Sequence, residues 1–171
     1  MQVDRSQIIV DADIARSASE TEHPISGTSR RLLAQMLERE LMVVMCDQLA
    51  EEWRNHRSAY SRRWLGAMTA RKRVVRIKPD QIVMRAIERH LTDKDEIIAR
   101  KDAHLVDAAL CSQALVASND SAARQVFQRA SVHFGAIRGI IWFVPRLHEE
   151  LLGDILKPAA NTMTVCCLVD P

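Results

Sequence analysis

Glycine is scarce in this chain, with five among 171 residues, and none of the five belongs to a phosphate-binding loop. The patterns GxGxxG and GxxxxGK[ST], whose backbone amides hold the phosphates of dinucleotides and ATP, do not occur. The sequence therefore disfavours the nucleotide-binding enzymes that depend on such loops. Aromatic residues are also few, at 4%, so a core must rest on aliphatic side chains and methionine.

Metal sites built from cysteine and histidine are missing as well. The six histidines show no HExxH or similar spacing, which disfavours a zinc centre. The cysteines form no CxxC pair, and two adjacent thiols rarely suit one tetrahedral site. Reduced thiols, packed or exposed, are the ordinary interpretation, as in proteins of a reducing compartment. The four cysteines are Cys46, Cys111, Cys166 and Cys167.

Long apolar runs are absent too. The longest candidate, residues 137–144, is interrupted by Arg138 and Gly139, and it is far shorter than the ~20 residues of a membrane span. Residues 1–7 are mostly polar and the apolar run after them has only three residues, which does not predict a signal peptide. We expect a cytoplasmic protein with no membrane contact.

The charge is nearly balanced overall, at +2, but it is unevenly distributed. Residues 53–90 hold eleven lysines and arginines against two acids, a net charge of +9, so the rest of the chain carries −7. This division favours an anionic partner bound by one region, although a solvated helical surface would look the same. Tyr60 and Trp64 would either stack on nucleic-acid bases or belong to the core. The basic residues expected to contact nucleic acid are Arg54, Arg57, Arg62, Arg63, Arg71, Lys72 and Arg73.

Short apolar segments alternate with helical patterns, which predicts an α/β fold with a mainly parallel central sheet. Strands are expected at residues 8–10, 41–45, 115–117 and 139–144. Helices are expected from residue 28 or 29 through 37, and over residues 47–68, 81–91, 102–114 and 122–130. Loops are expected at residues 23–28 and 92–96, and residues 69–79 have no clear assignment. An edge strand or a partner-binding segment is possible at residues 163–169.

Two acids stand where two of the predicted strands end. Asp11 directly follows the strand at residues 8–10, and Asp120 closes the segment Ser118-Asn119-Asp120 after the strand at 115–117. Ligand sites in open parallel sheets lie outside the carboxyl ends of the strands. Either acid alone would also suit a helix N-cap. The two together favour a site at this edge of the sheet.

Helical phase selects a third acid. In the helix expected from Asp102, that residue shares a face with apolar residues 105, 106 and 109, so it points to the buried side. Asp107 is rotated about 140° away, at roughly 100° per residue. The alternative for Asp102 is an ordinary helix-start acid favoured by the helix dipole. His104, beside it, is expected at the surface or in a hydrogen bond rather than as a metal ligand.

The same argument selects a fourth acid in the helix at residues 47–68. Glu52 shares a face with Leu49 and Trp53, whereas Glu51 lies on the polar face. Two carboxylates about 4 Å apart repel by roughly 4 kcal/mol at an effective dielectric near 20. Converging acids must therefore raise their pKa values or bind a hard cation. Oxygen ligands of this kind suit Mg²⁺ or Mn²⁺.

Four segments of the chain resemble the PIN-domain nucleases, a group that includes the VapC-like toxins. They occur in the family's order, and each contributes one of the acids selected above. By this resemblance, Asp11, Glu52, Asp102 and Asp120 are the metal-holding catalytic acids, and Asp13, Ser118 and Asn119 support them. The segments are IIVDADIARSA at 8–18, MCDQLAEEW at 45–53, KDAHLVDAAL at 101–110 and LVASND at 115–120.

The resemblance implies a three-layer α/β/α sandwich and Mg²⁺- or Mn²⁺-dependent hydrolysis of single-stranded or structured RNA. It places the nuclease domain at residues 1–145, with a C-terminal helix and tail at 146–171 in the same domain. It also suggests a cognate antitoxin and a homodimer as partners. One metal ion or two, and RNA or DNA as the substrate, stay open at this point.

Three departures from the family pattern bear on the site. Asp13 stands where the family often has asparagine, which adds negative charge. Ser118 replaces the commoner threonine and keeps a hydroxyl. A further acid sometimes found after the last segment is absent, since residues 121–124 contain none.

Two other functions fit parts of the pattern. A catalytically inactive PIN-like module would bind RNA or protein without using the four acids. A receiver-type signalling domain also gathers acids at strand ends, but it needs a lysine after a later strand. This chain has Pro145-Arg146 in that place, which disfavours the receiver.

Overall fold

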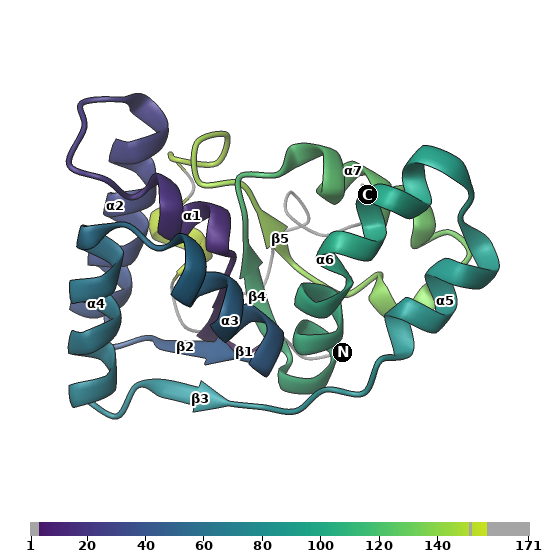
Figure 1. The fold of residues 1–171 in the computed structure, drawn as a ribbon, viewed down its shortest axis with the longest axis horizontal. Helices are drawn as coiled ribbons and strands as arrows, with labels where there is room; N and C mark the ends of the chain where they lie inside the picture. Colours follow the sequence, from purple (N-terminus) through teal and green to yellow (C-terminus); the bar gives the residue numbers. More distant parts are fainter. Residues whose placement is uncertain (1–3, 151, 157–171) are drawn as a thin grey trace.

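The computed structural model describes residues 4–150 and 152–156, and within them five parallel strands form one sheet in the order β3-β2-β1-β4-β5. Figure 1 shows this sheet between two groups of helices. Strand β4, most of β2 and the second half of β1 (Ile8, Ile9 and Val10) are buried, which is why these segments are continuous apolar runs. The strands are β1 (Asp4–Val10), β2 (Met42–Met45), β3 (Val74–Arg76), β4 (Ala114–Ala117) and β5 (Trp142–Phe143).

The helices cover both faces of the sheet. Right-handed crossovers from β1 to β2 and from β2 to β3 put their helices on one face, and the return from β3 to β4 puts its helices on the other. Figure 1 shows α1–α4 on one side and α5–α7 on the other. The predicted three-layer α/β/α sandwich is therefore confirmed. The helices are α1 (Ala12–Ser17), α2 (Pro24–Glu38), α3 (Asp47–His56), α4 (Ala59–Ala70), α5 (Ile82–His90), α6 (Asp93–Ser112), α7 (Ser121–Ala130), η1 (Gly135–Ile137) and α8 (Leu152–Ile155).

The sheet has its switch point between β1 and β4, because the chain leaves β1 towards β2 and leaves β4 towards β5. The carboxyl ends of these two strands border the crevice where open α/β sheets bind ligands. A receiver domain has the strand order 2-1-3-4-5, which differs from the order found here. The receiver alternative is therefore excluded by topology.

Helix α2 begins earlier than the sequence predicts. Residues 23–28 were expected to form a loop, but the helix starts at Pro24, and His23 accepts a hydrogen bond from the Ile25 amide as its N-cap. The fixed φ of proline suits the first helical position. The hydroxyl of Thr28 donates to the Pro24 carbonyl, so a polar residue is accommodated on the buried side of the helix.

The helix expected over residues 47–68 is two helices. Helix α3 ends at His56, and Ser58 caps α4 by accepting a 3.1 Å hydrogen bond from the Ser61 amide. Residues 69–79, unassigned from the sequence, contain a turn and the edge strand β3. The last strand is shorter than the 139–144 expected, since β5 covers only Trp142–Phe143.

The charged stretch at residues 92–96 is part of α6 and not a connector. This helix has twenty residues and begins at Asp93. Its first turn contains Asp93, Asp95 and Glu96, whose negative charges favour a helix N-terminus. Asp102 therefore lies in the middle of α6, and its interpretation as a helix-start acid is wrong.

Beyond β5, the structure describes the short helix α8 within the predicted C-terminal segment 146–171. The expectation of a strand or partner-binding segment at 163–169 lies outside the described residues. None of the described helices is long and apolar enough to cross a membrane.

Candidate functional site

Asp11 lies where β1 ends, and it also caps α1. Its backbone amide donates to the Ala117 carbonyl of β4 at 2.9 Å, which fixes the end of β1 against its neighbour. Its Oδ2 accepts a 2.7 Å hydrogen bond from the Ser118 hydroxyl. Only 7% of Asp11 is exposed. This burial raises the pKa of Asp11, although the bonds from Ser118 and from the Asp13 amide offset part of the effect.

Asp13 lies one position into α1 and joins the same group. Its Oδ2 accepts a 2.9 Å hydrogen bond from the Asn119 amide and lies 3.5 Å from the Ser118 hydroxyl. Its Oδ1 is buried and has no hydrogen-bond partner among the residues that the structure describes. Burial, followed by the negative charge of Asp11, raises the pKa of Asp13 to about 8. The three predicted supporting residues thus form one polar group with Asp11.

Asp120 begins α7, next to the end of β4. Its Oδ1 accepts a 2.8 Å hydrogen bond from the Ala123 amide, so it is the N-cap of this helix. Its own amide donates to the Ser118 hydroxyl at 3.0 Å. The cap uses one of the two carboxylate oxygens, and the side chain is exposed. Capping and a place in the site are therefore compatible for this residue.

Asp102 points from the middle of α6 towards the other acids. Burial, together with the charges of Asp11, Asp120 and Glu52, raises its pKa to about 7 against a lowering effect of His104. The charges of three other carboxylates can shift the pKa of Asp102 only if they lie near it. The structure thus brings together the four acids that the sequence analysis selected, from four different segments of the chain.

Glu52 is held in place by a histidine that the sequence analysis did not include in the site. His104 Nε2 lies 3.1 Å from Glu52 Oε2, and the His104 ring is only 7% exposed. Gln48 donates to the other oxygen of Glu52 at 3.2 Å. Burial acts to raise the pKa of Glu52, but the hydrogen bond and charge of His104 outweigh it and lower the pKa. In the sequence, the only indication of this role is that His104 is a polar residue between the apolar residues Ala103 and Leu105.

The acids do not yet form the coordination sphere of a metal. Among residues 4–150 and 152–156, no three acidic, histidine or cysteine side chains lie together closely enough to hold an ion. The donor set is nevertheless rich in carboxylate oxygens, which suit Mg²⁺ or Mn²⁺. The raised pKa values of Asp11, Asp13 and Asp102 show that their negative charges are poorly compensated. The chemistry of the site therefore fits a divalent cation, while its spacing requires side chains to turn inward.

Asp107 is buried, although the sequence analysis placed it off the buried stripe of its helix. It is only 5% exposed because α5 covers it, and its Oδ1 accepts a 2.9 Å hydrogen bond from the Val83 amide. Burial raises its pKa, against the lowering effect of that bond. Asp107 thus accepts a hydrogen bond from the first turn of α5 and does not belong to the group of four acids.

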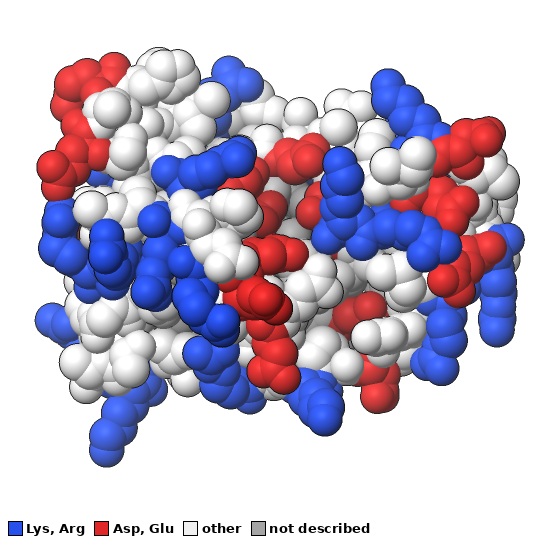
Figure 2. Space-filling view, in the orientation of Figure 1, with Lys and Arg blue, Asp and Glu red and all other residues white. Residues whose placement is uncertain are grey.

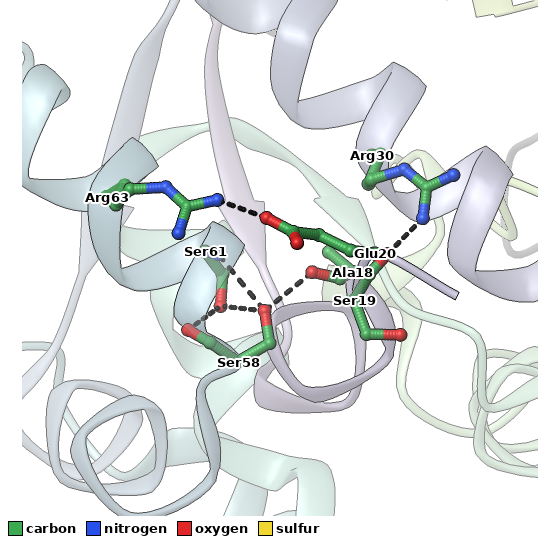
Figure 3. A network of polar contacts seen from close by, with 7 residues as sticks. All are labelled: Ala18, Ser19, Glu20, Arg30, Ser58, Ser61 and Arg63. Carbon is green, nitrogen blue, oxygen red and sulfur yellow. Dashed lines mark hydrogen bonds and ion pairs between the residues drawn. The ribbon is translucent and has the colours of Figure 1, made fainter. Parts of the chain in front are cut away.

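A network of serines fixes α4 against α1, the helix that carries Asp13 (Figure 3). The Ser58 hydroxyl donates to the Ala18 carbonyl at 2.5 Å, and the Ser61 hydroxyl donates to the Ala15 carbonyl at 2.6 Å. Both carbonyls lie at the C-terminal end of α1, where backbone carbonyls have no hydrogen-bond donor within the helix. The network therefore anchors the carboxyl end of α1, while Asp11 caps its other end.

The predicted basic track is divided by internal bonds. Arg63 forms an ion pair with Glu20 at 2.5 Å, also visible in Figure 3. Arg73 pairs with Glu40 at 2.8 Å, and its guanidinium also donates to the Leu37 carbonyl. These two arginines are partly engaged within the protein. The other predicted positions, Arg54, Arg57, Arg62, Arg71 and Lys72, are exposed or half-buried.

Trp64 belongs to the core and is not available to stack on bases. Only 4% of it is exposed, and its Nε1 donates to the Leu33 carbonyl at 2.6 Å. Trp53 is buried too, and its Nε1 donates to the carbonyl of Val10 at the end of β1 at 2.7 Å. Trp53 thereby ties α3, which carries Glu52, to the strand that leads to Asp11.

The surface charge follows this arrangement. Figure 2 shows acidic side chains gathered near the middle of one face, with lysine and arginine side chains on both sides of them. Three of the basic residues, Arg54, Arg57 and Arg76, line one groove of about 430 Å³ beside α3. Asp47 and Glu51 line the same groove, so its charge is mixed.

The chain matches no model of a known protein family. None of the curated proteins is significantly similar to it. The resemblance to PIN-domain nucleases therefore stays a prediction from the four segments.

Proposed function

We propose that this protein is a metal-dependent endoribonuclease with a PIN-like site. The observation that carries the proposal is the convergence of Asp11, Glu52, Asp102 and Asp120 at the switch point of a parallel sheet. Each comes from a different segment, and Asp102 responds to the charge of the other three. Clustered acids whose pKa values are raised by burial and by one another are typical of functional sites.

The four acids would hold one or two Mg²⁺ or Mn²⁺ ions. When bound, such an ion supplies charge stabilisation for a phosphodiester and activation of water. Ser118 fixes one oxygen of Asp11 and receives the Asp120 amide, so it sets the spacing between two of the acids. His104 and Gln48 orient Glu52 from its two oxygens. These positioning residues keep the acids aligned without being ligands.

We propose RNA as the substrate, because the acidic centre is flanked by basic side chains that can hold a polyanion. The same chemistry would act on DNA, so matched DNA strands belong in every assay. A cognate antitoxin and a homodimer stay as predicted partners. A cytoplasmic location also stays a prediction, and it is compatible with the free thiols of Cys46 and Cys111.

A second function is favoured by one observation. Because the described acids do not yet enclose a metal ion, the fold would also suit a non-catalytic module that binds RNA through its arginines. The two functions differ in whether RNA is cut when a divalent cation is supplied.

The decisive experiment is cleavage of a mixed set of end-labelled RNAs by the purified protein. We expect fragments with Mn²⁺ or Mg²⁺ and none with EDTA, and we expect DNA strands of the same sequence to be cut more slowly. An intact RNA set with every metal, together with retained RNA binding, would reject the nuclease in favour of the binding module.

The salt dependence of RNA binding tests the groove lined by Arg54 and Arg57. Replacing both by glutamine should lower the slope of log K against log salt by about 1.4, since each phosphate contact to a single strand contributes about 0.7. The Arg63→Gln variant should change the slope less, because Glu20 already engages that guanidinium. The control is Arg129→Gln, which should leave the slope unchanged, because Arg129 lies outside the groove and pairs with Asp95. Equal slopes for all four proteins would show that RNA binds elsewhere.

A further inference from the structure

A pocket of about 220 Å³ opens beside the candidate site, between the start of α3, the segment after β3, and helices α5 and α6. We call it the Met84 pocket. It is smaller than the roughly 300–1,000 Å³ of pockets for drug-sized ligands, so it suits a single ring system. Its apolar lining comes from Ile77, Pro79, Met84 and Ala103, and its amides come from Gln48 and Gln81.

Two side chains belong both to this pocket and to the surroundings of the acids. His104 lines the pocket and lies 3.1 Å from Glu52. Gln48 lines it as well and donates to the other oxygen of Glu52. His104 and Gln48 therefore lie between the pocket and Glu52, one of the four acids. A polymer bound across the acids would place its neighbouring unit at the pocket.

The chemistry of the lining matches a nucleobase. Flat aromatic rings bind between apolar walls, and the edges of a base pair with side-chain amides and carboxylates. Gln48 and Gln81 offer both donors and acceptors at the rim, and the Asp107 carboxylate contributes to the lining. Lys78 is exposed at the mouth of the pocket, where an ammonium can meet the phosphate that joins the base to its strand.

We propose that the Met84 pocket binds one base of the RNA strand, next to the phosphodiester at the acids. This assignment rests on the proposed nuclease function and adds a base-recognition site to it. Base recognition beside the cutting position would make cleavage depend on sequence. Gln48 would then link recognition to the site, since it touches both the pocket and Glu52.

Methionine-methyl NMR in EDTA tests this without requiring cleavage. Nucleoside monophosphates should shift the Met84 methyl signal and leave that of Met68, buried on α4, unchanged. Ribose 5-phosphate, which has no base, should leave both signals unchanged. Failure of all four monophosphates to move the Met84 signal would overturn the proposal, as would an equal shift with ribose 5-phosphate.

Two variants locate the binding. Ala103→Leu fills the pocket from α6 and should weaken nucleotide binding at least about tenfold, because the base loses its space. Gln81→Leu changes only the exposed rim and should weaken binding without disturbing the fold. Gln125→Leu, on the exposed side of α7, is the matched control. Unchanged binding by both pocket variants, with the Met68 signal in its original position, would reject the pocket.

The two proposals fail in different ways. Cleavage with Mn²⁺ but no shift of the Met84 signal would reject the base pocket and leave the nuclease. A specific shift with no cleavage under any metal would retain base binding but remove its assigned position beside a cutting site.

Discussion

We expect the replacement of Asp102 by asparagine to lower the proposed metal-dependent RNA cleavage by at least about 100-fold. Substitutions of residues that only orient metal ligands cost 10–100-fold in metal affinity or activity, so the loss of a ligand should exceed that range. The charges of the other three acids all act to raise the pKa of Asp102, so its carboxylate belongs to their group. The asparagine keeps the size of the side chain but removes the charge that attracts a cation. Initial rates on a labelled RNA at several Mn²⁺ concentrations measure the effect.

A matched variant separates this effect from general damage to α6. Asp95 lies on the same helix and pairs with Arg129 on the surface, so Asp95→Asn should retain the cleavage rate. If Asp102→Asn and Asp95→Asn cut RNA equally well, the four acids are not the catalytic site. RNA binding in EDTA should be unchanged or stronger for Asp102→Asn, since a negative charge near the phosphates is removed.

We expect the protein in EDTA to be less stable at pH 8 than at pH 5. The pKa values of Asp102, about 7, and Asp13, about 8, both lie above the ordinary value near 3.8. The folded state therefore binds these protons more tightly than the unfolded state. The resulting stability is complete below about pH 4 and is lost as the pH rises through 7 and 8. After allowance for partial exposure, the two acids together contribute on the order of 3 kcal/mol, a shift of about 6–12 °C in melting temperature.

Thermal unfolding in EDTA between pH 5 and pH 8 measures this loss. The double variant Asp13→Asn, Asp102→Asn should lose part of the pH dependence and melt higher than the parent at pH 8, while Asp11 and Asp107, whose pKa values are also raised, keep the rest. Adding Mn²⁺ at pH 8 should stabilise the parent and have little effect on the double variant, because the cation replaces the protons. The raised pKa values would be contradicted if the parent protein melted at the same temperature at pH 8 as at pH 5 and its melting temperature changed with pH no more than that of the double variant.

The sheet could be predicted from the sequence because its inner strands are buried on both faces. Runs such as Ile8-Ile9-Val10 then have no polar positions, and they are recognisable even when short. The starts of two helices could not be predicted. Helix α2 opens with proline and polar residues, and α6 opens with charged ones, so neither start shows apolar periodicity. Both starts instead contain residue types that suit a helix N-terminus, a proline in α2 and acids in α6.

The candidate site, like the fold, has features that could be predicted from the sequence and others that could not. Strand ends and helical phase selected Asp11, Glu52, Asp102 and Asp120, because both signals are local in the sequence. The partners of the acids are not local. The contact between His104 and Glu52 joins residues on α6 and α3, and the bond from Val83 to Asp107 joins α5 and α6. Only the packing of those helices determines such pairs.

The strand order also governs when the site can exist during synthesis. The four acids are spread along the chain from residue 11 to residue 120. Strand β4, which follows α6 in the chain, pairs directly with β1. A ribosome that has released residues only through α4 has delivered two of the acids and neither β4 nor α6. A strand from late in the sequence must insert beside the first one before the remaining acids meet them. The growing chain therefore completes its group of four acids only after α6 and β4 have been released and β4 has paired with β1.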